Sequence, residues 1–140
     1  MTDSHREVRL ERLEQGRYRV VNARGGVMEL GDGSNGDFTP VELLLAAIAG
    51  CTAIDVDLLT TKRTEPEHFA VTASGEKVSD DTGNHMSDLQ VRFDVAFGDD
   101  AAGQKSAERL PDAVRRSHDR LCTVSRTVER GTAVDTRPNG

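Results

Sequence analysis

The sequence predicts one α+β domain over residues 1–140, with antiparallel sheets packed on a long, buried central helix. Two observations predict this class. Short segments with alternating apolar residues lie on both sides of one long apolar segment, and a later segment repeats apolar residues at helical spacing. The expected order is three strands, a helix, two strands, two helices and a last strand, which is typical of an α+β fold.

Alternation of apolar and polar residues predicts the strands. The strongest such pattern is Leu89–Phe97, where every second residue is apolar. Because only one face of such strands is apolar, we expect an antiparallel sheet with one side covered by a helix. Ser79–Asp88 is expected to be a polar loop. The other predicted strands are Val8–Leu13, Arg17–Asn22, Val27–Leu30, Phe69–Ala73 and Thr132–Thr136.

The central helix has a clear predicted start. Thr39 is the expected N-cap, Pro40 suits the first helical position, and Glu42 completes a capping box. Leu43–Ile54 then contains no charged residue and is apolar or small on every side, which predicts burial. We expect this helix to run to Lys62.

A second, amphipathic helix is predicted over Ala107–Leu121, where apolar residues recur at spacings of three and four. Pro111 lies inside this pattern, so it must either start the helix or kink it. A short helical turn over Thr123–Arg130 should follow, capped by Gly131.

Composition limits both the core and the partners. Apolar residues make up 36% of the chain and aromatic residues 4%, so a single chain would have a thin core and a partner chain is expected to contribute. The 24 acidic and 18 basic residues give a net charge of −6. Binding to nucleic acid needs a basic surface, so this balance argues against a nucleic-acid partner.

Cysteine content and hydropathy predict a cytoplasmic protein. Two cysteines are too few for the disulfide framework of a small secreted domain, and Met1–His5 carries no basic or apolar run typical of a secretory signal. The uncharged stretch Leu43–Ile54 is shorter than the roughly 20 residues of a membrane-spanning helix. We therefore expect no membrane partner and two available thiols.

Each cysteine has a structural and a chemical interpretation. Cys51, in the middle of the apolar helix, is either a small core residue or a nucleophilic thiol, and the second role requires a nearby cation. Cys122 follows the second helix and has the same two interpretations. If the fold brings the two together, one can attack and the other resolve, as in redox-cycling thiols.

Other chemistries have weaker support in the sequence. His118 and Cys122 are four residues apart, but further ligands would have to come from Cys51, His68 or His85, and no C-x-x-C or H-E-x-x-H spacing exists. We therefore expect no metal. No phosphate-binding glycine loop and no G-x-S-x-G motif is present, so no cofactor and no hydrolase triad are expected.

Two segments resemble a known family. Thr39–Val56, TPVELLLAAIAGCTAIDV, is similar to the central-helix motif of the OsmC/organic hydroperoxide resistance family. Leu121–Thr127, LCTVSRT, is similar to the second-cysteine motif of that family. The order of elements and nearly the whole chain length also fit, so the resemblance covers one complete OsmC-like domain.

The resemblance implies an intertwined homodimer with active sites at the subunit interface. It also implies that Cys51 attacks the O–O bond of an organic hydroperoxide and becomes a sulfenic acid. Cys122 would then condense with this group to form a disulfide, which an external dithiol reduces. A second thiol nearby is the general protection of a sulfenate against overoxidation.

The sequence departs from the peroxidase pattern in two places. Peroxidatic members carry Asn-Pro-Glu before the central helix, and that glutamate holds an arginine beside the thiolate; here Val41 stands at the matching position and Glu42 follows. Thr123 replaces the proline that usually follows the second cysteine. The pattern thus resembles the broader OsmC-like branch.

Two residues are candidates to support the thiols. Glu42 is a catalytic candidate, although it lies nine residues from Cys51 on the opposite side of a regular helix, and its capping role explains it without catalysis. Arg24 is the first candidate for the activating cation, and Arg126 is the second.

Two functions follow as hypotheses. The first is a thiol-dependent peroxidase that reduces organic hydroperoxides through Cys51 and Cys122. The alternative is a non-peroxidatic, small-molecule-binding or stress-associated dimer whose thiols react weakly.

Overall fold

The computed structural model describes residues 4–139. Residues 1–3 and residue 140 lie outside the described residues. The expectation that Met1–His5 is not a secretory signal therefore falls partly outside them. The chain divides into two compact units, Met1–Leu44 and Leu45–Gly140, and each is described by itself. The prediction of a single domain stays a prediction.

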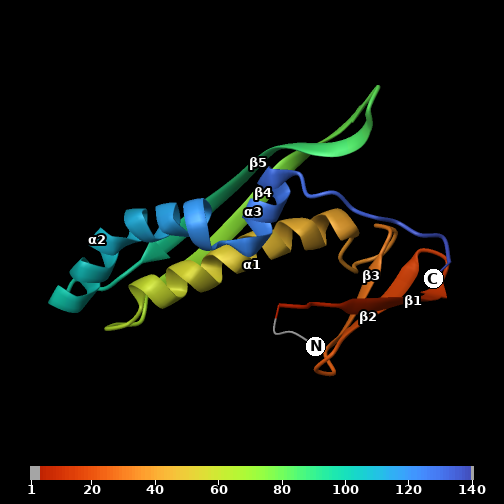
Figure 1. Cartoon of the computed structure of the whole chain (residues 1–140). Helices are drawn as coiled ribbons and strands as arrows, with labels where there is room; N and C mark the ends of the chain where they lie inside the picture. The colour runs from red at the N-terminus through yellow and green to blue at the C-terminus, as the bar shows by residue number, and fades with distance from the viewer. Residues whose placement is uncertain (1–3, 140) are drawn as a thin grey trace. The chain divides into compact units, whose positions relative to one another are not determined.

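The first unit is built on a three-stranded antiparallel sheet with the order β1-β2-β3 (Figure 1). Tight turns connect its strands, and Gly16 and Gly25 have positive φ angles there that glycine adopts without strain. These bounds confirm the three predicted amino-terminal strands to within a residue or two: β1 spans Val8–Glu14, β2 spans Arg17–Asn22 and β3 spans Val27–Gly31.

Helix α1, Pro40–Thr60, begins in the first unit and continues in the second. Its predicted start is confirmed, because the backbone N–H of Thr39 donates to Glu42 Oε1 at 2.9 Å and that of Glu42 donates to Thr39 Oγ1 at 3.3 Å. The helix ends two residues before the predicted Lys62. By length and composition alone it could cross a membrane, a test that the core helix of a globular protein also passes.

We expected α1 to be buried on every side, but within the single chain it is buried on only one. Its buried side chains form one stripe with a spacing of four residues, which is one face of a helix. Ile54 and Leu58 lie off this stripe and are 63% and 66% exposed. The buried residues of the stripe are Ile48, Thr52, Val56 and Thr60.

The second unit contains a long antiparallel hairpin of β4, His68–Asp80, and β5, Gly83–Ala96. The expected loop at Ser79–Asp88 is wrong, because the strands continue through it to a tight turn. The Asp80 carboxylate accepts the N–H of Thr82 at 2.9 Å, and Gly83 has a φ of +115°. The end of the hairpin is mostly polar, with Val78 and Met86 as isolated apolar residues, so it lacks the apolar alternation that predicts a strand.

Helix α2, Ala101–Arg116, begins earlier than predicted. The Asp100 side chain accepts the N–H of Gly103 at 2.8 Å and so caps a first turn that has no apolar repeat. Pro111 lies inside the helix and does not start it. The helix continues into a π-helical turn, η1, Ser117–Leu121.

Helix α3, Thr123–Arg130, follows directly and confirms the predicted helical turn. Gly131 caps it in the left-handed conformation, as expected. The predicted strand at Thr132–Thr136 is wrong, since these residues pair with no strand of the described chain and Val134 is 87% exposed.

Candidate functional site

Cys122 stands at the junction between η1 and α3 and caps α3. Its sulfur accepts the backbone N–H of Ser125 at 3.4 Å, and its S–H donates to Ser125 Oγ at 3.3 Å. The side chain is fully buried. A cap of this kind satisfies one of the free N–H groups at a helix start, so local bonding holds the sulfur in place.

The π-helical turn fixes the backbone of Cys122. Its N–H donates to the carbonyl of Ser117 at 2.8 Å, the five-residue bond that defines such a turn. One extra residue in the last turn therefore sets where the chain leaves the helix. π-Turns inside helices are frequent at functional sites.

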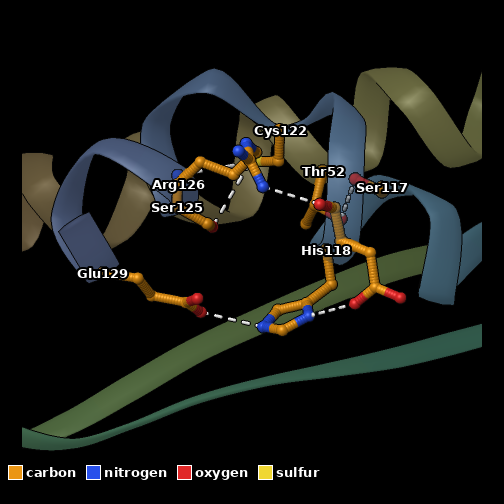
Figure 2. Close-up of polar contacts among 8 residues, drawn as sticks. Thr52, Ser117, His118, Cys122, Ser125, Arg126 and Glu129 are labelled. Carbon is orange, nitrogen blue, oxygen red and sulfur yellow. Dashed lines mark hydrogen bonds and ion pairs between the residues drawn. The ribbon is translucent and has the colours of Figure 1, made fainter.

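A buried chain of hydroxyl and carboxyl groups joins η1 to α1. Ser117 Oγ donates to Asp55 Oδ2 at 2.7 Å. It also lies 2.7 Å from Thr52 Oγ1 (Figure 2). Thr52 and Ser117 are both buried, and Asp55 is half-buried. Thr52 directly follows Cys51, so this chain connects the helix of one cysteine to the turn before the other.

The structure brings Cys51 and Cys122 together. Cys51 is half-buried in α1, and both cysteines carry free thiols. Partial burial, which penalises the charged thiolate, is the main cause that raises the pKa of Cys51 above its ordinary value. The Cys122 thiol, a hydrogen-bonding and electrostatic neighbour, raises this pKa further.

The start of α3 opposes these effects. The backbone N–H groups of Val124 and Thr123 favour the thiolate and lower the pKa of Cys51, although less than burial raises it. Both sulfurs therefore meet the first turn of the same short helix, where N–H groups favour negative charge. Among the described residues, no cation contributes to the shifted pKa of Cys51.

The structure gives hydrogen bonds for both candidate cations, Arg126 and Arg24, and neither of these bonds is to Cys51. Arg126 donates from Nη1 to the backbone carbonyl of Asp119 at 2.6 Å. Arg24 is exposed in the turn between β2 and β3, and its backbone N–H donates to Asn22 Oδ1 at 2.9 Å. Arg24 belongs to the first unit and both cysteines to the second, so its role as an activating residue stays a prediction.

Glu42 is engaged at the start of α1. Its carboxylate accepts the N–H of Thr39 in the capping box, and its side chain is exposed. The contact is the one that the capping interpretation predicts. A catalytic role of Glu42 stays a prediction.

A cavity of about 410 Å³ lies in the second unit, and its wall contains a neighbour of each cysteine. Ser125, which bonds the sulfur of Cys122, and Thr52, which follows Cys51, both lie in its wall. Most of the wall is apolar, with residues from α1, both hairpin strands, α2 and α3. The apolar lining residues are Leu45, Ile48, Ala73, Leu89, Val91, Phe93, Val114 and Val128.

His118 forms the polar side of this cavity together with Glu129. Its ring bonds Asp119 through Nδ1 at 2.9 Å and Glu129 through Nε2 at 2.8 Å (Figure 2). These carboxylates, Asp119 first, raise the pKa of His118 above its ordinary value. Within residues 4–139, no group of three or more His, Cys, Asp or Glu side chains is arranged to hold a metal ion.

Several residues of the site were not predicted from the sequence. Ser125 carried a usable signal, because a serine three residues after a helix cap is placed to bond the capping side chain. Thr52, Asp55 and Ser117 carried none, since their bonds join residues more than 60 positions apart.

The chemistry that this arrangement allows is thiol chemistry. A sulfenic acid on Cys51 would lie beside a second thiol, and condensation of the two gives a disulfide. Apolar walls nearby suit an organic group better than a charged one.

Comparison with known proteins agrees with the sequence resemblance. An uncharacterized protein of Mycobacterium bovis is 29% identical over 128 residues, which are 90% of each chain. A solved OsmC-like protein of unknown function from Vibrio cholerae has a TM-score of 0.73 at 14% identity, covering 90% of this chain and 94% of that one. An organic hydroperoxide resistance protein OsmC from Legionella pneumophila has a TM-score of 0.61 at 15% identity, covering 91% of both chains.

These structural likenesses show the fold, and the predicted α+β class with the OsmC-like fold is confirmed. The sequence pattern of the family described as OsmC-like protein matches residues 31–137, which is most of the chain. The chain therefore belongs to the OsmC-like protein family.

Proposed function

We propose that the protein is a thiol-dependent peroxidase that reduces organic hydroperoxides. The observation that carries this proposal is the proximity of two free thiols, Cys51 and Cys122, at the first turn of α3. The family supports it, because one structural neighbour is an organic hydroperoxide resistance protein.

The first step is attack by the Cys51 thiolate on the hydroperoxide. The sulfur bonds to the terminal oxygen, the O–O bond breaks, and the organic group leaves as an alkoxide that takes a proton to become an alcohol. Cys51 is oxidised to a sulfenic acid and the hydroperoxide is reduced. The apolar cavity beside Thr52 and Ser125 favours substrates with an apolar organic group over hydrogen peroxide.

The second step is attack by Cys122 on the sulfur of the Cys51 sulfenic acid. The S–S bond forms, the S–O bond breaks, and hydroxide leaves with the proton of the Cys122 thiol as water. An external dithiol then reduces the disulfide by exchange, and it supplies the two electrons of the cycle. Neither step uses a metal or an organic cofactor.

Stopped-flow oxidation of the reduced protein by cumene hydroperoxide tests the proposal. The wild type should react much faster than free cysteine, and Cys51→Ser should remove the reaction. Cys122→Ser should still consume one equivalent of hydroperoxide but accumulate the sulfenic acid on Cys51. A wild-type protein that reacts no faster than free cysteine would contradict the proposal.

The raised pKa of Cys51 favours a second candidate function. A thiol whose pKa is raised, with no cation among the described residues that shift it, is a poor nucleophile at neutral pH. The departures at Val41 and Thr123 point the same way. The second candidate is a small-molecule-binding or stress-associated dimer with weakly reactive thiols, and a measured Cys51 pKa at or above its ordinary value would favour it.

The proposal includes a homodimer. Ile54 and Leu58 on α1, and Val8 and Val27 in the first unit, are each more than 60% exposed in the single chain. Large apolar side chains exposed in this way favour a protein contact. Sedimentation should therefore give about 30 kDa, twice the chain mass of 15.2 kDa.

The proposal also includes a cytoplasmic location with no membrane partner. A cycle that passes through reduced thiols needs a compartment that keeps them reduced. Cell fractionation followed by detection of the chain would test this location.

A further inference from the structure

Ser117 forms hydrogen bonds to Cys122 itself and to two residues of α1, the helix that carries Cys51. Its carbonyl accepts the N–H of Cys122 at 2.8 Å. Its hydroxyl bonds two residues of α1, Asp55 at 2.7 Å and Thr52 at 2.7 Å, and Thr52 is the neighbour of Cys51 in sequence. Ser117 itself is fully buried.

The hydrogen bonds of this chain have a defined direction. Ser117 has one hydroxyl proton, and it donates this proton to the Asp55 carboxylate. The bond to Thr52 must therefore run the other way, with the Thr52 hydroxyl as donor and Ser117 Oγ as acceptor. Each group has a fixed role, so the chain holds η1 at one position along α1.

We propose that Ser117 is the positioning residue of the thiol pair: it holds the segment that carries Cys122 against the helix that carries Cys51, so that their disulfide can form. This role rests on the proposed function, in which the disulfide closes the cycle. Ser117 does not touch the reacting sulfur atoms, and it acts through Thr52 and the backbone of Cys122.

Disulfide formation is sensitive to this kind of support. A disulfide forms only when the two Cα atoms lie within about 7 Å of each other and the Cβ atoms face each other. Small displacements of groups that must meet can lower a rate or an equilibrium constant strongly. Loss of the Ser117 hydroxyl should therefore weaken the disulfide more than an equal loss of a buried hydroxyl elsewhere.

The test is an equilibrium that contains no hydroperoxide. The reduced full-length protein is incubated with oxidised glutathione, which accepts two electrons from the thiol pair and becomes two molecules of reduced glutathione. The fraction of Cys51–Cys122 disulfide is then measured by mass spectrometry across a series of glutathione ratios. The equilibrium constant reports how well the two thiols are held together.

Four variants separate positioning from general loss of stability. Ser117→Ala should lower this equilibrium constant about tenfold, the change expected from one buried hydrogen bond. Ser106→Ala, a buried serine in α2, is the matched control and should leave it unchanged. Thr52→Val keeps the shape but removes the donor to Ser117, and should act like Ser117→Ala. Thr52→Ser keeps the hydroxyl and should stay close to the wild type.

The outcome decides the proposal whether or not the peroxidase activity is found. If Ser117→Ala and Thr52→Val change the equilibrium no more than their controls, the positioning role is wrong. If Ser117→Ala does not fold, the comparison of Thr52→Val with Thr52→Ser decides alone. An inactive wild type with a Ser117-dependent disulfide would overturn the peroxidase proposal and keep the positioning role.

Discussion

The two cysteines are held by segments of opposite character. Helix α1, which carries Cys51, is apolar on most sides, yet it buries only four side chains within the single chain. The segment from α2 through α3, which carries Cys122, is amphipathic. Its free helix-end groups are hydrogen-bonded within the segment, at the Asp100 cap, the π-helical turn and the Gly131 cap.

The surroundings of the two sulfurs differ in the same way. Cys122 is fixed by residues within five positions of it, Ser117 and Ser125. The pKa of Cys51 depends on burial and on groups from a distant part of the sequence, Cys122 and the N–H groups of Val124 and Thr123. The difference teaches that the position of Cys122 is built locally, whereas the pKa of Cys51 depends on what packs around α1.

The largest expected effect is a difference in thiol accessibility. In the folded, reduced protein, iodoacetamide should label the half-buried Cys51 on the order of a hundredfold faster than the fully buried Cys122, which must open first. Because the pKa of Cys51 is raised, its labelling rate should keep rising with pH through and beyond about 8.5, the ordinary pKa of a thiol. Peptide mass spectrometry at several pH values measures both effects.

The denatured protein is the control, since both thiols should label at similar rates there. Faster labelling of Cys122 than of Cys51 in the folded protein would reverse the comparison. A Cys51 rate that stops rising near neutral pH would show a depressed pKa, and so a cation beside the thiol. That result would make Arg24 the first residue to replace.

The sequence predicted the parts of the fold that local bonds specify. The Thr39 and Glu42 capping box and the Gly131 cap are contacts between near neighbours, so their residue types are sufficient to place them. The end of the β4–β5 hairpin was missed because most of its residues are polar and its few apolar residues are isolated. Pairing such as Lys77 with Met86 then shows no alternation in the sequence.

The candidate site was also predictable only where a local motif specifies it. The two thiols were found through the two motifs that resemble the family, and Ser125 lies inside the second motif. The chain of Thr52, Asp55 and Ser117 depends on the packing of η1 on α1, which no local pattern encodes.

A second, smaller effect compares the two faces of α1. Val56 is fully buried, so Val56→Ala should cost about 2 kcal/mol of unfolding free energy in urea titrations. Leu58 is 66% exposed, and Leu58→Ala should instead weaken the proposed dimer while the chain stays folded. Sedimentation at several concentrations measures the dimer, and circular dichroism checks the fold. Equal unfolding losses for both variants, with an unchanged mass, would contradict a shared core at Leu58.

The smallest expected effect concerns the stability that His118 contributes, at the polar side of the cavity in the segment from α2 through α3. Asp119 and Glu129 raise the pKa of His118 in the folded protein, so this ion pair adds stability at low pH, where histidine is charged in both states. The added stability is lost as the pH rises through the raised pKa. Because all three side chains are more than half exposed, the contribution should be at most about 1 kcal/mol.

Glu129→Gln should therefore lower the pKa of His118 and reduce the unfolding free energy more at about pH 5.5 than at about pH 8.5. The proton NMR titration of the His118 ring measures the first effect, and urea unfolding at both pH values measures the second. Glu108→Gln, at an exposed glutamate of α2, is the matched control and should move neither. An unchanged His118 titration in Glu129→Gln would mean that Asp119 alone sets this pKa, as the larger of the two causes.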